Sequence, residues 1–254
     1  MESCTEKRPL MEIKYQVRCN SMIEKLLPCE EQVSASGSSS QHQGEAPPTR
    51  TIFLLSPANS SGVRAKILFS PNAQSDLAQR LRQCRVPLGE VYSFISGLYF
   101  RGKLTYAERF KNPPPGVAGV YVITAAAGLQ SPELMVTLPE LQKLSASRVD
   151  HSNPDYRIPL DRDALSLRAI LEPDTRVVLL GSIATPKYIL PLSEIFGERL
   201  HFPKDFLGRG DMSRGSLLLR CCSHGAPLEY APVSSAMGQE RRPTARSPRR
   251  SSKR

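Results

Sequence analysis

The chain has 254 residues, of which 40% are hydrophobic, and a formal net charge of +10. This apolar fraction is enough for a packed domain, but no apolar run approaches the roughly 20 residues that cross a bilayer. The six cysteines form no CxxC pair and the four histidines lie far apart, which argues against a zinc site or a disulfide framework. We therefore expect a cytoplasmic protein with no membrane partner, no metal and no cofactor.

Composition divides the chain into three parts. Residues 30–50 are rich in serine, glutamine and glycine, and residues 239–254 carry seven basic side chains against one acidic side chain. Segments of this kind do not bury enough apolar surface to fold. We expect a low-complexity, disordered extension over 1–49, an α/β domain over 50–233 and a disordered basic tail over 234–254.

The first half of the domain predicts alternating strands and helices. A buried strand at 51–55 runs into the turn SPANSSG, and apolar spacing indicates a helix at 72–83. A second strand, GEVYSFIS at 89–96, is expected before a helix at 98–110. The third strand, GVYVITA at 119–125, shows no polar alternation, which is typical of a parallel strand covered on both faces.

The second half continues this alternation and then departs from it. We expect a short helix at 138–145, a polar connection at 150–159, a helix at 161–171, a strand at 176–183 and a helix at 186–196. This pattern predicts an α/β fold with a mostly parallel sheet and flanking helices. The run SLLLRCCSHGAPLEYAPV at 216–233 predicts a C-terminal β-hairpin with its turn at 223–226.

The turns that follow the strands are the expected ligand site, because ligands of open α/β sheets bind beyond the carboxyl ends of the strands. Small and hydroxyl side chains there let a ligand approach the backbone, and nearby basic side chains favour an anion. The residues expected to contact the ligand are Ser56, Asn59, Arg64, Arg101, Lys103 and Thr124. A structural interpretation stays open for these turns: SPANSSG ends a strand, and Thr185 and Pro186 of GSIATP start a helix.

The segment GRGDMSRG at 208–215 is the most unusual local pattern in the chain. Glycines give the backbone freedom and expose amides, and two guanidiniums beside them favour a bound anion. We expect a functional loop in which Gly208, Arg209, Gly210, Arg214 and Gly215 bind the ligand. A structural turn is the alternative interpretation.

Two side chains are candidates for acid–base catalysis, Asp211 and Tyr99. Asp211 lies among glycines and arginines, and Tyr99 lies near the turn after the expected second strand. Each also has a structural interpretation. Asp211 pairs with an arginine to shape its loop, and Tyr99, with Phe100 and Tyr106, packs in the core.

The run ISGLYFRGKLTYAERF, followed by GVYVITAAAGL, resembles a pattern of uncharacterised bacterial Rossmann-like α/β domains. These are loosely similar to peroxide-stress and nucleobase-processing proteins, and the likeness covers about residues 51–128. Those groups often carry a Ser/Lys-rich turn after the first strand and an Ala-Lys-Tyr-Gly-Leu-like turn later, where this chain has SPANSSG and AAAGL. A lysine or tyrosine function at the later turn is therefore not carried over.

Two functions follow as hypotheses. In the first, the chain binds a nucleotide or another phosphate-bearing ligand in a cleft at the sheet edge, and nucleoside glycosyl transfer or hydrolysis is the reaction to test. In the second, it is a non-catalytic module that binds nucleic acid through a basic surface and the arginine-rich tail. An enclosed pocket favours the first and a shallow basic groove the second. The sequence leaves open whether the protein is an enzyme.

Overall fold

A computed structural model describes residues 49–239, with side chains described up to residue 236. Of the segments expected to be disordered, 1–49 and 234–254, residues 1–48 and 240–254 lie outside the described residues. Between residues 49 and 239, the α/β architecture is as predicted, with a six-stranded sheet in the order β4-β3-β1-β6-β7-β8.

The centre of the sheet is parallel and its two edges are antiparallel. The parallel strands are β3 (Val120–Ile123), β1 (Thr51–Leu55), β6 (Arg176–Leu180) and β7 (Leu200–Pro203). The edge strands β4 (Leu129–Gln130) and β8 (Tyr230–Pro232) run antiparallel to their neighbours. In the central register Phe53 lies between Val120 and Val178. All five residues of β1 are buried, as the continuous apolar run predicts.

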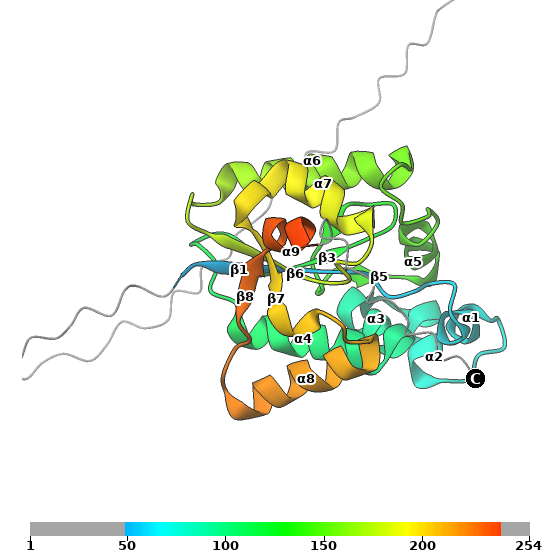
Figure 1. Cartoon of the computed structure of the whole chain (residues 1–254). Coiled ribbons are helices and arrows are strands. Elements are labelled where there is room, and N and C mark those ends of the chain that lie inside the picture. Colours follow the sequence, from blue (N-terminus) through cyan, green and yellow to red (C-terminus); the bar gives the residue numbers. More distant parts are fainter. Residues whose placement is uncertain (1–48, 240–254) are drawn as a thin grey trace, which may run out of the picture. The chain divides into compact units, whose positions relative to one another are not determined.

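Helices cover both faces of this sheet (Figure 1). One face packs against α4 (Leu98–Phe110) and α8 (Asp211–His224), and the other against α6 (Pro154–Ile170), α7 (Pro186–Phe196) and α9 (Val233–Gln239). Successive residues of β1 point to opposite faces. Phe53 and Leu55 therefore join the core under α4 and α8, whereas Ile52 and Leu54 join the core under α6 and α7.

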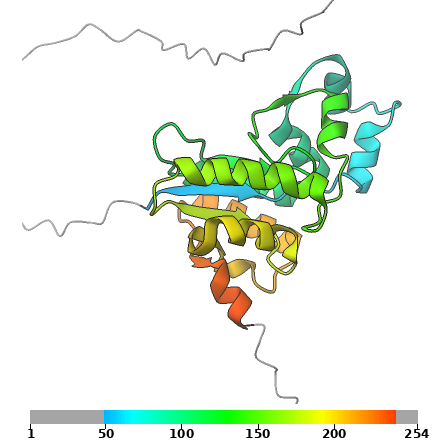
Figure 2. The same ribbon diagram turned by 90° about the horizontal axis from the view of Figure 1, so that it is seen from above.

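A smaller group of helices lies at one end of the sheet (Figures 1 and 2). It comprises α1 (Val63–Phe69), α2 (Asp76–Gln83), α3 (Leu88–Ser96) and α5 (Leu138–Leu144), with an antiparallel pair of β2 (Val86–Pro87) and β5 (Met135–Val136). Single 3-10 turns flank β7: η1 (Gly197–Arg199) and η2 (Lys204–Phe206). These helices build one side of the site described below.

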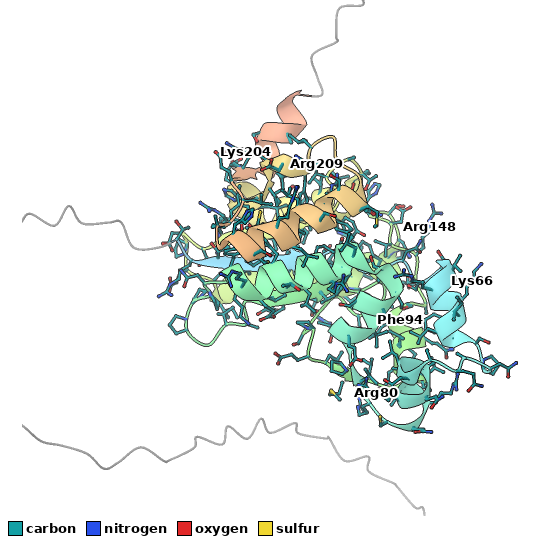
Figure 3. All side chains as sticks on the ribbon, turned by 90° about the horizontal axis from the view of Figure 1, so that it is seen from below. Lys66, Arg80, Phe94, Arg148, Lys204 and Arg209 are labelled. Atoms are coloured by element: carbon teal, nitrogen blue, oxygen red, sulfur yellow. The ribbon has the colours of Figure 1, made fainter. Side chains whose placement is uncertain are left out.

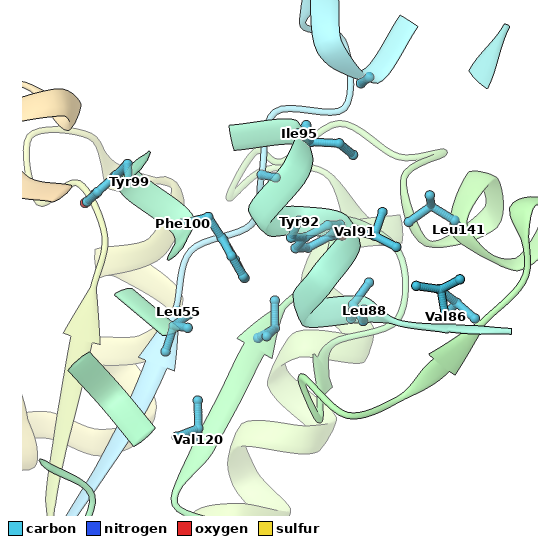
Figure 4. Packing of buried hydrophobic residues seen from close by; sticks show 14 of the residues in the cluster. Leu55, Val86, Leu88, Val91, Tyr92, Ile95, Tyr99, Phe100, Val120 and Leu141 are labelled. Atoms are coloured by element: carbon cyan, nitrogen blue, oxygen red, sulfur yellow. The ribbon is translucent and has the colours of Figure 1, made fainter. Parts of the chain in front are cut away.

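The predicted strand at 89–96 is wrong, because this segment is helix α3. Its buried residues Leu88, Val91, Tyr92 and Ile95 are three, four and seven positions apart, the spacing of one helical face (Figure 4). The aromatic and β-branched composition of the segment suggested a strand, but the periodicity decides its structure.

The predicted C-terminal hairpin is also wrong. Residues 211–224 form the single helix α8, which ends at Gly225 in the left-handed conformation with φ of 74°. Only the second predicted strand forms, as β8, and its partner is β7 rather than the run SLLLRCC. The segment 208–215 is consequently no free loop, since its second half is the first turn of α8.

Other elements agree with the prediction except at their ends. The helices at 98–110 and 186–196 and the short helix from 138 are confirmed. The expected helix at 72–83 is α2, which begins later, where the Ser75 hydroxyl accepts from the Ala78 N–H, and the helix α1 before it was not predicted. Helix α6 starts at Pro154, within the expected connection, because Asn153 caps it. Residues 234–239, assigned to the tail, belong to α9.

Candidate functional site

A pocket of about 820 Å³ lies at the carboxyl ends of β1, β3 and β6. The turn at 56–61 after β1, Ala125 after β3 and Ser182 after β6 form its floor, and side chains from α3, α4, α7, α8 and the segment 142–149 complete its walls. The pocket therefore joins the strand-end turns that the sequence singles out, and it adds helices that sequence reasoning did not connect to them.

The order of the strands explains this position. From β1 the chain crosses to β3 on one side of it, and later to β6 and β7 on the other. The helices that follow β1 and β6, α4 and α7, pack on opposite faces of the sheet. In open α/β sheets this divergence opens a crevice between the two strands, where ligands bind. Ser56, at the end of β1, remains tied to β6 because its backbone N–H donates to the Leu180 carbonyl at 3.1 Å.

Lys103 lies directly behind Ser56. Its side chain, 1% exposed, comes from α4, and Nζ donates to the Ser56 carbonyl at 2.6 Å and to Ser56 Oγ at 2.8 Å. Nζ also lies 4.6 Å from the centre of the Tyr99 ring and 4.9 Å from that of Phe100. Burial lowers the pKa of Lys103 to about 7, against the opposing effect of Asp211. A large fraction of this amine is thus uncharged at neutral pH.

Three buried tyrosines, Tyr92, Tyr99 and Tyr188, line the pocket. Burial raises the pKa of Tyr92 and of Tyr99 to about 12, and it raises that of Tyr188 as well. All three are therefore neutral phenols at physiological pH. The Tyr99 hydroxyl oxygen is buried and forms no hydrogen bond of normal geometry with the residues that the structure describes. It is suited to donate a proton or a hydrogen bond to a ligand.

Asp211 is the one carboxylate among the residues that line this pocket. It begins α8, its side chain is exposed, and Oδ1 lies 3.6 Å from Nη1 of Arg214. Arg214 is itself buried and donates from Nε and Nη2 to the Phe206 carbonyl at 3.2 and 2.9 Å. The expected ion pair is present, and it leaves the Asp211 carboxylate at the edge of the pocket.

Two cations line the pocket, Arg148 and Lys187. Arg148 is exposed and lies 3.8 Å from the Asp150 carboxylate. Figure 3 shows it on the same side of the molecule as Lys66. Lys187, in the first turn of α7, lies over the ring of Tyr188 with Nζ at 4.9 Å from its centre. These side chains bring positive charge to a pocket that is otherwise rich in hydroxyl groups.

The structure brings four of the predicted site residues together, because Ser56, Asn59, Tyr99 and Asp211 all line the pocket. Lys103 reaches it through Ser56. The structural interpretations given above hold in part as well, since Pro186 starts α7 and Tyr99 packs in the core together with Phe100 and Tyr106.

Other predicted residues lie outside the pocket lining: Arg64, Arg101, Thr124, Gly208, Arg209, Gly210, Arg214 and Gly215. The buried hydroxyl of Thr124 donates to the Gly128 carbonyl at 3.0 Å and so closes the turn after β3. Arg209 is exposed and donates to Ser213 Oγ at 3.3 Å. Gly215 packs against α4, where a Cβ atom would lie 2.9 Å from the Leu98 carbonyl oxygen.

Sequence reasoning did not place Tyr92, Tyr188 or Arg148 in the site. Tyr92 was assigned to a strand rather than to helix α3, so the direction expected for its side chain was wrong. Residues 146–149, between the expected helix at 138–145 and the connection at 150–159, received no role, although serine and arginine ahead of a helix start are a composition found at binding sites. The signal was therefore present at Arg148, whereas only the packing of α7 brings Tyr188 to the pocket.

Comparison with protein-family models, with curated proteins and with solved structures finds no match to this chain. Between residues 49 and 239, no helix is long and apolar enough to cross a membrane. In the same range, no three His, Cys, Asp or Glu side chains gather in a group that could hold a metal ion.

Proposed function

We propose that this chain binds a nucleotide, or a related phosphate-bearing nucleoside, in the pocket between β1 and β6. The observation that carries the proposal is the combination of a pocket of about 820 Å³ at the topological switch point with hydroxyl, aromatic and cationic side chains in its walls. This volume lies within the range of pockets for cofactor-sized ligands, roughly 300–1,000 Å³.

The two ends of such a ligand find different partners. Lys187 and Arg148 supply positive charge for phosphate, together with the turn at 58–60, whose backbone N–H groups form no hydrogen bond within the described residues. The neutral hydroxyls of Tyr92, Tyr99 and Tyr188 supply hydrogen bonds to the sugar or base.

Cleavage of an N-glycosidic bond is the reaction that these residues favour. Such a reaction develops positive charge on the sugar, and a nearby carboxylate stabilises it. Asp211 supplies that carboxylate at the edge of the pocket, and Tyr99 supplies a neutral acid that can protonate a departing base. Asp211 and Tyr99 thus keep, in this proposal, the roles expected from the sequence.

Calorimetric titration of the full-length protein with nucleosides and nucleoside mono-, di- and triphosphates tests the binding. At least one phosphorylated compound should bind, and Lys187→Ala should weaken that binding about five- to tenfold while Lys66→Ala, an exposed cation outside the pocket lining, leaves it unchanged. Chromatography of the incubated ligand then tests for release of the free base. Absence of binding by every compound would refute the proposal.

The nucleic-acid alternative is an outcome of the same experiment. Its main support, the arginine-rich tail at 241–254, lies outside the described residues. Salt-sensitive binding of oligonucleotides without any nucleotide binding, and loss of that binding when residues 240–254 are removed, would favour it.

A further inference from the structure

Ser56 and Lys103 form a pair whose placement has a chemical meaning beyond nucleotide binding. Ser56 lines the pocket, and Lys103 lies behind it with Nζ 2.8 Å from Oγ. An aliphatic amine within hydrogen-bond distance of the hydroxyl of a pocket-lining serine is an arrangement typical of a nucleophile and its general base.

We propose that Ser56 is a catalytic nucleophile and Lys103 its general base, and that the pocket accepts a substrate with an ester or other activated acyl group. The two residues come from elements far apart in sequence, the end of β1 and the middle of α4, so only the fold creates the pair. The inference uses the pocket described above but does not require that its ligand be a nucleotide.

The reaction balances without any reagent other than water. Ser56 Oγ attacks the carbonyl carbon of the substrate and its proton moves to the uncharged Nζ of Lys103. The leaving group departs with that proton, which leaves an acyl-serine and a neutral amine. Water then gives a proton to Nζ and attacks the acyl carbon, and Oγ recovers the proton as the free acid leaves.

The surroundings of Lys103 favour the uncharged amine, which can act as a base, over a permanently charged one. Among residues 49–236, whose side chains the structure describes, no carboxylate forms an ion pair with Nζ, and its hydrogen bonds go to the carbonyl and hydroxyl oxygens of Ser56. The titratable or charged groups that face this region are Tyr99 on α4, Tyr92 on α3, Tyr188 on α7, and Asp211 and Arg214 on α8. Of these, Asp211 favours the charged amine, and burial outweighs it.

Ser56 has competing contacts that the mechanism must accommodate. Its hydroxyl donates to the Leu180 carbonyl at 3.3 Å, a long hydrogen bond. Rotation of the hydroxyl about the Cβ–Oγ bond turns the proton from that carbonyl to Nζ with no movement of the backbone. The backbone N–H groups of the turn at 58–60 are available to stabilise the oxyanion.

A fluorophosphonate probe tests the pair on the full-length protein. Attack of Oγ on phosphorus expels fluoride and leaves a stable adduct, which intact mass spectrometry counts and peptide mapping locates. We expect one adduct, on Ser56, that Ser56→Ala abolishes. Lys103→Met should slow its formation at least about 100-fold, the lower range for loss of a general base. Lys111→Met, an exposed lysine just beyond α4, should leave the rate unchanged.

A pH profile of the natural chain covers the case in which Lys103→Met fails to fold. The labelling rate should rise with pH and level off above about pH 7, because only the uncharged amine takes the proton. No adduct on Ser56 at any pH, or an adduct whose rate depends neither on pH nor on Lys103, would overturn the proposal. Labelling without nucleotide binding would instead separate this activity from the function proposed above.

Discussion

Two segments of this chain have similar compositions and different roles. The β1 turn, SPANSSG at 56–62, and the α8 start, GRGDMSRG at 208–215, are both rich in glycine and serine. The β1 turn lies at the floor of the pocket with six consecutive lining residues, 56–61. The α8 start contributes only Asp211 to the pocket. Composition alone therefore did not distinguish a turn that lines a pocket from the start of a helix that packs against its neighbour.

The difference has a physical origin in what each segment contacts. The β1 turn follows a strand of the parallel sheet, where the topology leaves a crevice. In the α8 start, Gly215 and Gly102 let α8 and α4 approach closely: a Cβ on Gly102 would lie 2.8 Å from the Gly215 carbonyl oxygen. Arg214 is occupied by the Phe206 carbonyl. Most of the residues of the α8 start that suggested a binding loop are therefore engaged in packing or in contacts within the segment.

The largest effect is expected for Gly215→Val. The new side chain would collide with the backbone of Leu98 and Tyr99, so α4 and α8 must separate, at a cost of about 3 kcal/mol or more. Urea unfolding of the variant measures this loss. Ser216→Ala, exposed on the same helix, is the matched control and should change the free energy of unfolding by less than about 0.5 kcal/mol. Equal stability of the two variants would contradict the close packing.

The next largest effect is the pH dependence that Lys103 gives to stability. The pKa of this amine is lowered on folding, so above pH 7 the unfolded chain binds more protons than the folded chain and stability rises with pH. The rise attributable to Lys103 between pH 7 and 9 should be about 2 kcal/mol. Urea unfolding at both values measures it. The rise should disappear in Lys103→Met and persist in Lys111→Met.

A comparison of the two arginines in the α8 start sharpens the contrast between the segments. Arg214→Ala removes both guanidinium hydrogen bonds to the Phe206 carbonyl and leaves it only the longer one from the Arg209 N–H at 3.3 Å, so the free energy of unfolding should fall by about 2 kcal/mol. Arg209→Ala removes an exposed side chain and should change it by less than about 0.5 kcal/mol. Thermal unfolding of the two variants side by side measures the difference. If Arg209→Ala lost ligand affinity, the α8 start would take part in binding, contrary to this prediction.

The smallest effect on stability is expected in the β1 turn. The Asn59 side chain accepts from the Ser61 N–H at 3.1 Å and from Ser61 Oγ at 2.7 Å, and all three groups are exposed. Asn59→Ala should therefore cost about 0.5 kcal/mol or less, yet it should weaken nucleotide binding several-fold because the turn lies at the pocket. Calorimetric titration and thermal unfolding of one preparation separate the two effects. A stable variant with unchanged affinity would remove Asn59 from the site.

Much of the fold was predictable because its strands and most helices carry their own signals. The strands β1, β3 and β6 are continuous apolar runs, and α7 shows proline at its first position and apolar residues at helical spacing. The errors arose where two signals conflicted. In α3, residue types that favour strands follow a helical spacing, and in α8, Gly225 marks a helix end beside an apolar run of strand length.

The candidate site was predictable only in outline. Ser56 and Asn59 were found because a turn after a buried strand is a general location for ligands. Lys103 was selected for its charge, but nothing in its neighbours along the chain indicates that it is buried against Ser56. Tyr188 and Arg148 belong to elements whose positions depend on how the helices pack, which a pattern of local residues does not encode.

By itself, the sequence determined the fold class, the positions of the strands β1, β3 and β6 along the chain, and the carboxyl edge of the sheet as the place of the pocket. These properties follow from hydrophobic periodicity and from the general topology of parallel sheets. Only the tertiary structure decided which charged side chains face the pocket and which are buried in packing. The environment of Lys103 and Arg214 is the reason, because burial and hydrogen-bond partners come from residues distant in the chain.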